Sequence, residues 1–396
     1  MIIKNIRIID PFYDEINDIE FDKGKIIKIG KLNSEEKEVF DGTGLTLWPG
    51  FIDLHAHFRD PGYLYKEDLE TGSNSALAGG YTTVHLMANT KPIVDDSELY
   101  YNIMERGRSL SKINIMQVVS VTKGLLGKEL IDMESLSEDI PFLSDDGKGI
   151  LSNKIMYEAM LKAASLNKGI MVHAEDGELS PMDYRLAEDL ITIRDVYLSG
   201  KTNCKIHFSH VSTKDSLETI AFGKEMGYPV TCEVTPHHLF FYDLDYRVNP
   251  PIRGEEDVKA VIESIKNGVV DCIGTDHAPH SKEDKEAGAP GMVGLETSFY
   301  ICYKKLVQEE KLSLSKLSAL LSYNGSKILK LNSKGRILPG YDADFTIIDL
   351  NGKTTIDSEK FLSKSRNTPY NGMNVQGSIL KTFVNGELKY DKGELL

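Results

Sequence analysis

Histidines recur along the central part of the chain, each placed where an apolar run ends. Residues 53–57 (DLHAH) hold His55 and His57, and His173 and His210 each close a later run. Alternate side chains of a strand share one face, so His55 and His57 point the same way. Imidazoles gathered together are ligands that Zn²⁺ prefers. The pattern predicts a metal site; the alternative is a set of polar histidines satisfied within a core.

Carboxylates end two further runs. Asp145 and Asp146 are adjacent, and a carboxylate between two cations can bridge them; spacing alone leaves open which of the two does so. A carbamylated lysine at Lys148 or Lys154 is the less favoured bridging alternative. Asp276, in the segment TDHAPH, follows the last run. A carboxylate beside both metal and water can accept a proton and pass it on, so Asp276 is the candidate general base, the alternative being a helix cap.

An arginine lies two residues beyond the histidine pair. A guanidinium close to a cationic centre is unfavourable unless an anion binds there, and its planar fork matches a carboxylate. Arg59 therefore predicts a substrate that carries a carboxylate, unless it forms a structural salt bridge. Asn89 ends the second run and is placed to reach the same site.

Eight short apolar runs alternate with helical segments, which is typical of a parallel sheet. The helical spacing is clearest at Val258, Val261, Ile262 and Ile265. No glycine-rich phosphate loop follows the first run, which disfavours a doubly wound dinucleotide fold. We therefore expect an α/β fold, a (β/α)8 barrel of the TIM type, whose carboxyl strand ends meet at one mouth. The expected strands are 52–57, 82–89, 113–122, 140–145, 170–173, 206–210, 230–234 and 270–275.

Both ends of the chain have the alternating pattern of exposed strands. It occurs at 2–8 and 25–30, and again at 344–349 and 380–384, where Asn385-Gly386 predicts a turn. The two ends are expected to form one small β-sandwich. The predicted domains are residues 1–50 together with 335–396 for the sandwich, and 51–334 for the barrel.

Composition excludes several classes of partner. The 396 residues carry a formal net charge of −14, without a basic cluster, which disfavours nucleic acid and anionic membranes. No apolar run approaches the ~18 residues of a membrane span. The four cysteines form no CxxC pair and suit reduced thiols. We expect a cytoplasmic protein whose metal is held by histidine and carboxylate.

The ordered motifs resemble the amidohydrolase superfamily and, within it, the dihydroorotases that use aspartate in place of a carbamylated lysine. The resemblance covers most of the chain. It rests on DLHAHFRDPG at 53–62, MANT at 87–90, SDDG at 144–147, VHAED at 172–176, HFSHVS at 207–212, EVTPHHL at 233–239, VNPP at 248–251, TDHAPH at 275–280, MVGLET at 292–297 and GRILPGYDADFTIID at 335–349. One departure is MANT, where the family commonly has MPNT.

The resemblance implies one or two zinc ions per subunit, two being the expected number. His55, His57 and Asp276 would hold one ion and His173 and His210 the other, with Asp146 bridging. The implied substrate contacts are Arg59, Asn89, Asn249 and His280. The implied reaction is the reversible hydrolysis of (S)-dihydroorotate to N-carbamoyl-L-aspartate in pyrimidine biosynthesis, with Asp276 as the catalytic acid and base.

Two alternatives remain at this stage. One is a related cyclic amidohydrolase, such as an allantoinase or a dihydropyrimidinase, although these usually use a carbamylated lysine and lack the arginine after HxH. The other is a silent scaffold for aspartate transcarbamoylase, which typically has lost ligands that this chain retains. A homodimer and a complex with an aspartate transcarbamoylase are both left open as partners.

Overall fold

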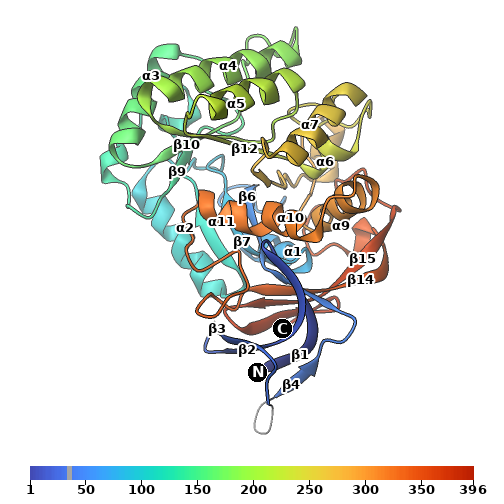
Figure 1. Cartoon of the computed structure of the whole chain (residues 1–396). Helices are drawn as coiled ribbons and strands as arrows, with labels where there is room; N and C mark the ends of the chain where they lie inside the picture. Colours follow the sequence, from blue (N-terminus) through green and yellow to red (C-terminus); the bar gives the residue numbers. More distant parts are fainter. Residues whose placement is uncertain (34–37) are drawn as a thin grey trace.

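The computed structural model describes residues 1–33 and 38–396, so that residues 34–37 of the predicted range 1–50 lie outside it. Figure 1 shows a barrel surrounded by helices, with the two chain ends side by side in a sheet beneath it. The expected (β/α)8 barrel with a β module from both termini is confirmed.

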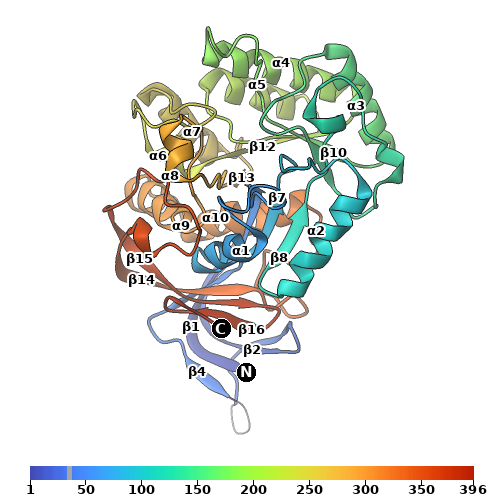
Figure 2. The ribbon, with the colours of Figure 1, turned by 180° about the vertical axis from the view of Figure 1, so that it is seen from behind.

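All eight expected barrel strands are present, most of them shorter than the apolar runs that predicted them. They are β6 (Phe51–Ala56), β7 (Tyr81–Leu86), β8 (Asn114–Gln117), β9 (Phe142–Ser144), β10 (Gly169–Val172), β11 (Lys205–Phe208), β12 (Val230–Val234) and β13 (Cys272–Ile273). Neighbours pair in parallel as β6-β7-β8 and as β9-β10-β11-β12-β13. Parallel bridges from Val119 to Leu143 and from Ala56 to His277 join the two sets into a closed ring. Figure 2 shows several of these strands from behind, enclosed by helices.

Helices follow most of the barrel strands. They are α1 (Leu69–Ala78), α2 (Ser97–Leu110), α3 (Asn153–Ser165), α4 (Tyr184–Thr202), α5 (Lys214–Glu225), α6 (Pro236–Phe240), α7 (Glu255–Asn267), α8 (Lys282–Glu286), α9 (Ser298–Cys302), α10 (Leu314–Ser318) and α11 (Asn324–Ile328). Val258, Val261, Ile262 and Ile265 of α7 are buried, as their spacing predicts. Across residues 1–33 and 38–396, no helix combines the length and the apolar content that crossing a bilayer requires.

Strands from both chain ends form one hydrogen-bonded sheet. They are β1 (Ile2–Asp10), β2 (Tyr13–Asp22), β3 (Lys25–Gly30), β4 (Val39–Asp41), β5 (Thr46–Pro49), β14 (Phe345–Thr355), β15 (Asn374–Val384), β16 (Glu387–Asp391) and β17 (Glu394–Leu395). β1, β2 and β3 are antiparallel as predicted, and β1 also pairs in parallel with β4 and β5. Asn385 and Gly386 form the turn between β15 and β16, both with positive φ.

Aromatic rings close this β module and join it to the barrel. The ring of Phe21 lies 5.0 Å from that of Phe345, and both belong to a cluster of buried residues from the two chain ends. The single tryptophan, Trp48, packs edge-on against Phe299, with ring centroids 5.9 Å apart. Because Trp48 is fully buried, this contact fixes the module against the bottom of the barrel.

Candidate metal centre and pocket

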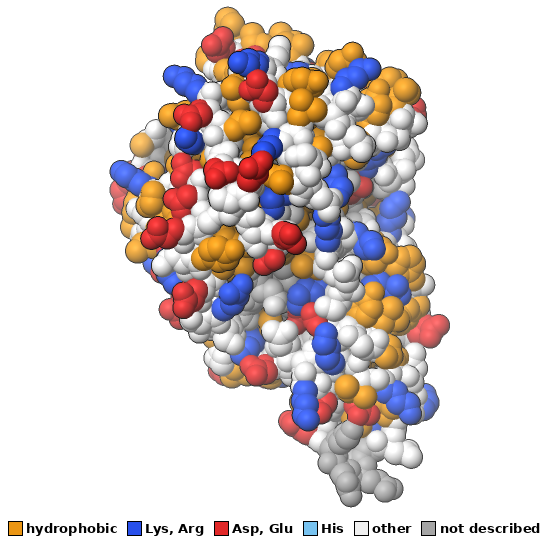
Figure 3. Space-filling view, turned by 90° about the vertical axis from the view of Figure 1, so that its left-hand side faces the viewer, with side chains coloured by type: hydrophobic (Ala, Val, Ile, Leu, Met, Phe, Trp, Pro, Cys, Tyr) orange, Lys and Arg blue, Asp and Glu red, His pale blue; other side chains and the backbone are white. Residues whose placement is uncertain are grey.

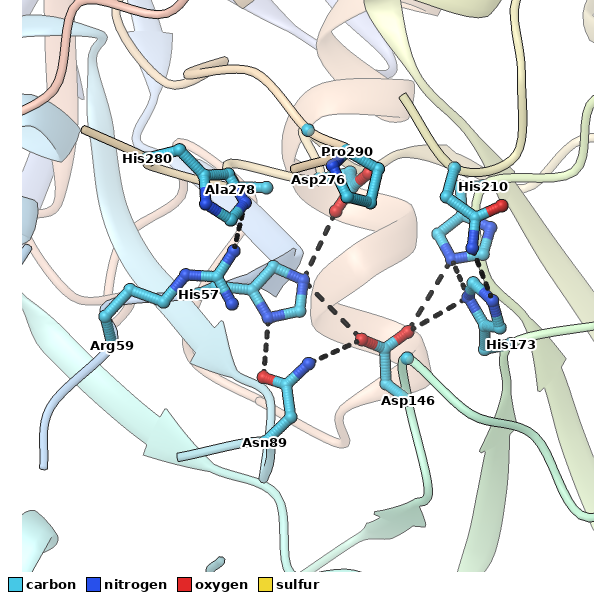
Figure 4. Close-up of a pocket in the computed structure, with 13 residues that line it drawn as sticks. His57, Arg59, Asn89, Asp146, His173, His210, Asp276, Ala278, His280 and Pro290 are labelled. Atoms are coloured by element: carbon cyan, nitrogen blue, oxygen red, sulfur yellow. Dashed lines mark hydrogen bonds and ion pairs between the residues drawn. The ribbon is translucent and has the colours of Figure 1, made fainter. Parts of the chain in front are cut away.

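The predicted metal ligands converge at the carboxyl ends of the barrel strands, and Figure 4 shows all of them except His55. His55 lies in β6 and His57 directly after it, while Asp146, His173, His210 and Asp276 follow β9, β10, β11 and β13. All six residues are buried. All except His55 line one pocket, which also contains the four predicted substrate residues, Arg59, Asn89, Asn249 and His280. The structure therefore brings together every residue that the sequence placed in the site.

The backbone is constrained where three of these residues leave their strands. Arg59, His210 and Asp276 have φ values of 60°, 40° and 47°, in the left-handed region that residues other than glycine rarely adopt. Such conformations persist only where the surrounding structure enforces them, and they concentrate at functional sites. Here they turn the side chains at the strand ends toward the pocket.

Asp146 is the centre of the cluster. Its Oδ1 lies 3.3 Å from Nε2 of His55, 3.5 Å from Nδ1 of His173 and 3.6 Å from Nε2 of His210. Its Oδ2 lies 3.5 Å from Nε2 of His57. Two groups of potential donors therefore share Asp146: one with His55 and His57, the other with His173 and His210.

These residues fit a divalent metal. Within the described part of the chain, neither Nε2 of His55 nor Oδ1 of Asp146 has a hydrogen-bond partner, although both are buried. A buried polar atom without a partner is costly, and an ion between the two groups would satisfy it. Imidazole nitrogens combined with carboxylate oxygens form a donor set typical of zinc.

Both acidic members of the cluster are anionic. Burial opposes ionisation of Asp146, but His55, His173 and His210 outweigh it and hold the pKa of Asp146 well below its ordinary value. Burial likewise opposes ionisation of Asp276, whose pKa is lowered by its hydrogen bond with His57 and by the nearby His55 and His210. Oδ1 of Asp276 lies 3.3 Å from Nε2 of His57. Both carboxylates are thus available as ligands or proton acceptors.

The alternative bridging residues face elsewhere. Asp145 accepts hydrogen bonds from the backbone N–H groups of Val121 and Thr122, at 2.7 and 3.0 Å, and therefore ties β9 to the preceding loop. Lys148 is exposed, and Lys154 is exposed in α3, where it lies 3.8 Å from Glu158. Of the candidates that the sequence left open, Asp146 is the one that lines the pocket.

Two side chains outside the donor set hold the histidine pair in place. Oδ1 of Asn89 accepts a hydrogen bond from Nδ1 of His57 at 2.9 Å, which leaves Nε2 of His57 free to face the centre. Nδ2 of Asn89 donates to Asp146 at 3.3 Å, so this predicted substrate residue also contacts two predicted ligands. On the other side, Oε1 of the fully buried Glu233 lies 3.3 Å from Nδ1 of His55.

One wall of the pocket is cationic. Nη2 of Arg59 lies 3.3 Å from Nε2 of His280, and Nζ of Lys66 lies 3.2 Å from Nδ1 of the same ring. Burial and these two cations lower the pKa of His280 to about 3, so the imidazole is neutral. A neutral imidazole has one donor and one acceptor nitrogen, yet both nitrogens face cations. An anion between Arg59 and His280 would relieve this mismatch.

The remaining predicted residue, Asn249, lies on the opposite side of the pocket. Its Nδ2 donates to Glu175 at 2.8 Å and lies 3.4 Å from Nε2 of His173. Glu175 also accepts from that nitrogen of His173 at 2.7 Å. The cavity enclosed by these walls measures about 180 Å³. That is smaller than the ~300–1,000 Å³ of pockets for drug-sized ligands and suits a single small ring.

Sequence reasoning gave no role to Glu233, Glu175 or Lys66, which hold His55, His173 and His280 respectively. Glu175 and Glu233 do stand in the quoted motifs VHAED and EVTPHHL. A carboxylate near a predicted ligand histidine in such motifs was the available signal, because metal-binding histidines usually give their second nitrogen to an acceptor. No comparable signal marked Lys66.

Comparison with known proteins gives a consistent result. The sequence profile described as "Amidohydrolase family" matches residues 46–389. The chain is 48% identical to a dihydroorotase of Clostridium botulinum (strain Eklund 17B / Type B), over 99% of this chain and 100% of that protein. It is 39% identical to a dihydroorotase of Bacillus subtilis (strain 168), over 96% of this chain and 95% of that protein.

Solved structures agree in fold. The L-hydantoinase (dihydropyrimidinase) of Arthrobacter aurescens superposes with a TM-score of 0.91 at 26% identity, over 100% of this chain and 97% of that one. The dihydropyrimidinase of Brevibacillus agri NCHU1002 gives a TM-score of 0.88 at 22% identity, over 100% and 96%. By the profile match and by identity over its whole length, the chain belongs to the amidohydrolase family and, within it, to the dihydroorotases.

Proposed function

We propose that this chain catalyses the reversible hydrolysis of (S)-dihydroorotate to N-carbamoyl-L-aspartate, with pyrimidine biosynthesis running toward ring closure. One observation carries the proposal: the guanidinium of Arg59, with the neutral His280 beside it, forms a cationic wall of the small pocket that Asp146 and the histidines also line. A ligand that suits this pocket has a cyclic amide beside Asp146 and the histidines, and a carboxylate beside Arg59. Dihydroorotate has both groups. The relatives named dihydroorotase support the same substrate.

We infer that the centre binds two zinc ions. His55, His57 and Asp276 would hold one ion, His173 and His210 the other, and Asp146 both. When bound, such ions polarise a carbonyl and lower the pKa of water from 15.7 toward ~7. The donor set supports zinc rather than Mg²⁺ or Ca²⁺, because those cations prefer oxygen ligands.

The chain's own residues would supply orientation and proton transfer. Arg59 and His280 would hold the substrate carboxylate, and Asn249 would contact the ring from the opposite side. Asp276, kept ionised, would accept a proton from the attacking water and deliver it to the ring nitrogen that leaves. Ring closure would use the same group in the reverse direction. Asn89 would keep His57 oriented while also contacting the substrate.

The test combines metal analysis with an assay. The purified protein is analysed for bound metal, and dihydroorotate hydrolysis is measured before chelation, after chelation and after zinc is added back. We expect about two zinc ions per chain, loss of activity with their removal, and recovery on return. A metal-free protein that keeps full activity would overturn the metal assignment. A metal-loaded protein that does not hydrolyse dihydroorotate would overturn the substrate assignment.

A second candidate is hydrolysis of a neutral cyclic amide, supported by the fold similarity to an L-hydantoinase. A neutral ring has no carboxylate to place between Arg59 and His280, which favours dihydroorotate. Parallel assays with dihydrouracil, hydantoin and allantoin distinguish the two. A silent scaffold is disfavoured because all six candidate metal residues are retained and lie together.

Other features remain predictions. They are the domain division into 1–50 with 335–396 and 51–334, the cytoplasmic location, and a complex with an aspartate transcarbamoylase. A homodimer is also proposed, and size measurement of the purified protein tests it directly.

A further inference from the structure

A short segment near the carboxyl end of the chain lies against the loops that form the cationic wall of the pocket. We call residues 363–367 the tail segment. It lies between the short 3₁₀ helix η5 (Ser358–Lys360) and β15, in the part of the chain that the sequence assigned to the β module. None of its residues, all of which the structure describes, lines the pocket. Its hydrogen bonds instead reach the two loops that carry Arg59 and His280.

Asn367 joins the two ends of the loop that carries His280. Its Oδ1 accepts a hydrogen bond from the backbone N–H of His280 at 3.2 Å. Its Nδ2 donates to the carbonyl oxygens of Ala278 and Gly291, at 3.1 Å each. Both carbonyls belong to buried residues, where a backbone oxygen without a donor is costly. All three partners line the pocket, so one amide side chain sets the spacing of this part of its wall.

The position of Asn367 is itself fixed by its neighbours. Its carbonyl oxygen accepts a hydrogen bond from the backbone N–H of Val293 at 2.9 Å. Two residues earlier, Oγ of the buried Ser365 donates to the carbonyl oxygen of Lys66 at 2.8 Å. The tail segment therefore bonds to both loops of the wall, the one that carries His280 and the one that carries Lys66.

The separation of these two loops decides how the ring of His280 faces the pocket. Nζ of Lys66 lies 3.2 Å from Nδ1 of His280, and Nη2 of Arg59 lies 3.3 Å from its Nε2. Figure 4 shows the latter contact beside the ring of His57. Hydrogen bonds weaken steeply as distance and angle depart from the ideal. A shift of the His280 loop would therefore misplace the ring relative to both cations at once.

We propose that Asn367 is a positioning residue for substrate binding. By holding the backbone of His280, it places the imidazole beside Arg59, where the substrate carboxylate binds. This role rests on the proposed function, because the carboxylate belongs to the same substrate. Among the described residues, none of the hydrogen-bond partners of Asn367 is a predicted metal ligand. Its loss should therefore weaken substrate binding while metal binding and proton transfer by Asp276 continue.

The first test compares zinc-loaded wild type with Asn367→Ala. We expect KM for dihydroorotate to rise about 10-fold, which corresponds to roughly one hydrogen bond, while kcat changes by less than about 3-fold. Zinc content should stay the same. Asn371→Ala is the matched control, because Oδ1 of Asn371 also accepts from a backbone N–H, that of Ser358 at 2.8 Å, and Asn371 does not line the pocket. The control should leave KM unchanged.

A conservative variant shows whether the hydrogen bonds are the cause. The hydroxyl of Asn367→Ser can still accept or donate, so its KM should lie between those of wild type and Asn367→Ala. Circular dichroism checks the fold of each protein, and Asn367→Ser decides the question if Asn367→Ala does not fold. Folding is expected, because Nζ of Lys285 also donates to the carbonyl oxygens of Ala289 and Gly291, at 2.8 Å each.

A double-variant cycle separates positioning from a general effect on the fold. In His280→Ala the ring that Asn367 places is gone, so adding Asn367→Ala should raise KM by less than about 3-fold further. The same factor in both backgrounds would overturn the proposal, and so would an active wild type whose KM is shared by Asn367→Ala and Asn367→Ser. A metal-loaded wild type that does not hydrolyse dihydroorotate would overturn the proposed function and this role with it.

Discussion

Oε1 of Glu233 lies 3.3 Å from Nδ1 of His55, and Asp146 lies 3.3 Å from the other nitrogen of that ring. A histidine that gives Nε2 to a metal carries its proton on Nδ1, and a carboxylate there fixes both tautomer and ring orientation. Oε2 of Glu233 faces His207 at 3.3 Å, so the carboxylate is held from both sides. Glu233 is therefore a positioning residue for the centre.

Replacing Glu233 with glutamine should weaken metal binding roughly 10- to 100-fold, the usual cost of losing such a partner. The variant keeps the volume of the side chain but removes its charge. Competition with a chromophoric chelator measures zinc affinity without any assay of activity. Glu296→Gln is the control, since that half-buried carboxylate accepts hydrogen bonds from the backbone N–H groups of Leu362 and Ser363, away from the centre. Equal affinities for all three proteins would remove Glu233 from this role.

Asp276→Asn should separate metal binding from proton transfer. Five predicted ligand residues remain, so we expect metal still to bind, while turnover falls by about 10²- to 10⁴-fold because the amide cannot accept a proton. Metal content and kcat are measured on the same sample. Asp145→Asn is the control. It removes a neighbouring carboxylate that ties β9 to the preceding loop and does not line the pocket. Wild-type turnover by a metal-loaded Asp276→Asn protein would contradict the assignment.

Arg59→Ala should raise KM for dihydroorotate by about 10- to 100-fold, because a charge-assisted hydrogen bond contributes roughly 1.5–3 kcal/mol. The effect on kcat should be smaller, since Arg59 holds the carboxylate rather than the reacting carbonyl. Arg7→Ala, which removes a guanidinium paired with Asp14 in the β module, is the control. An Arg59→Ala protein with unchanged KM would exclude the carboxylate contact.

Lys66 should act on the substrate through His280. By donating to Nδ1 at 3.2 Å, it leaves the ring proton on Nε2, which then faces the space beside Arg59. In Lys66→Met the ring can adopt the other tautomer, so we expect KM to rise and kcat to change less. Lys282→Met, an exposed lysine in α8, is the comparison. Partial recovery of KM in Lys66→Arg would support hydrogen bonding as the cause, and an unchanged KM in Lys66→Met would exclude it.

Much of the site could be predicted because strand periodicity and strand ends are local properties of a sequence. His55 and His57 share a face by the alternation of one strand, and His173 and His210 simply end their runs. The contact of Glu233 with His55 depends instead on ring closure between distant strands. The orientation of α4 was also inaccessible: Leu186, Leu190, Ile193 and Tyr197 have the spacing of a buried face, yet all four are exposed. Figure 3 shows hydrophobic side chains, with charged ones between them, at the upper end of the molecule where α3 to α5 lie. The buried side of α4 instead carries Ile191 and Val196 beside Glu188 and Asp189, whose carboxylates contact Arg253 and Ser216.

Glu296 should make the protein less stable as pH rises. Burial raises the pKa of its carboxyl to about 7, against an ordinary value of 4.5, despite hydrogen bonds from the backbone of Leu362 and Ser363. Between these two values the folded state holds more protons than the unfolded state, so the free energy of unfolding falls with rising pH. The loss develops from about pH 5 to about pH 7 and amounts to about 1 to 3 kcal/mol.

Glu296→Gln removes this titration while keeping the size of the side chain. Its amide oxygen can still accept from Leu362 and Ser363, so the fold should be retained. Urea unfolding of metal-loaded wild type and variant between pH 5 and 8 measures the difference. The wild type should lose stability relative to the variant as pH rises, because only the wild type must ionise a carboxyl enclosed by protein. Two curves that run parallel across this range would show that Glu296 titrates normally in the folded chain.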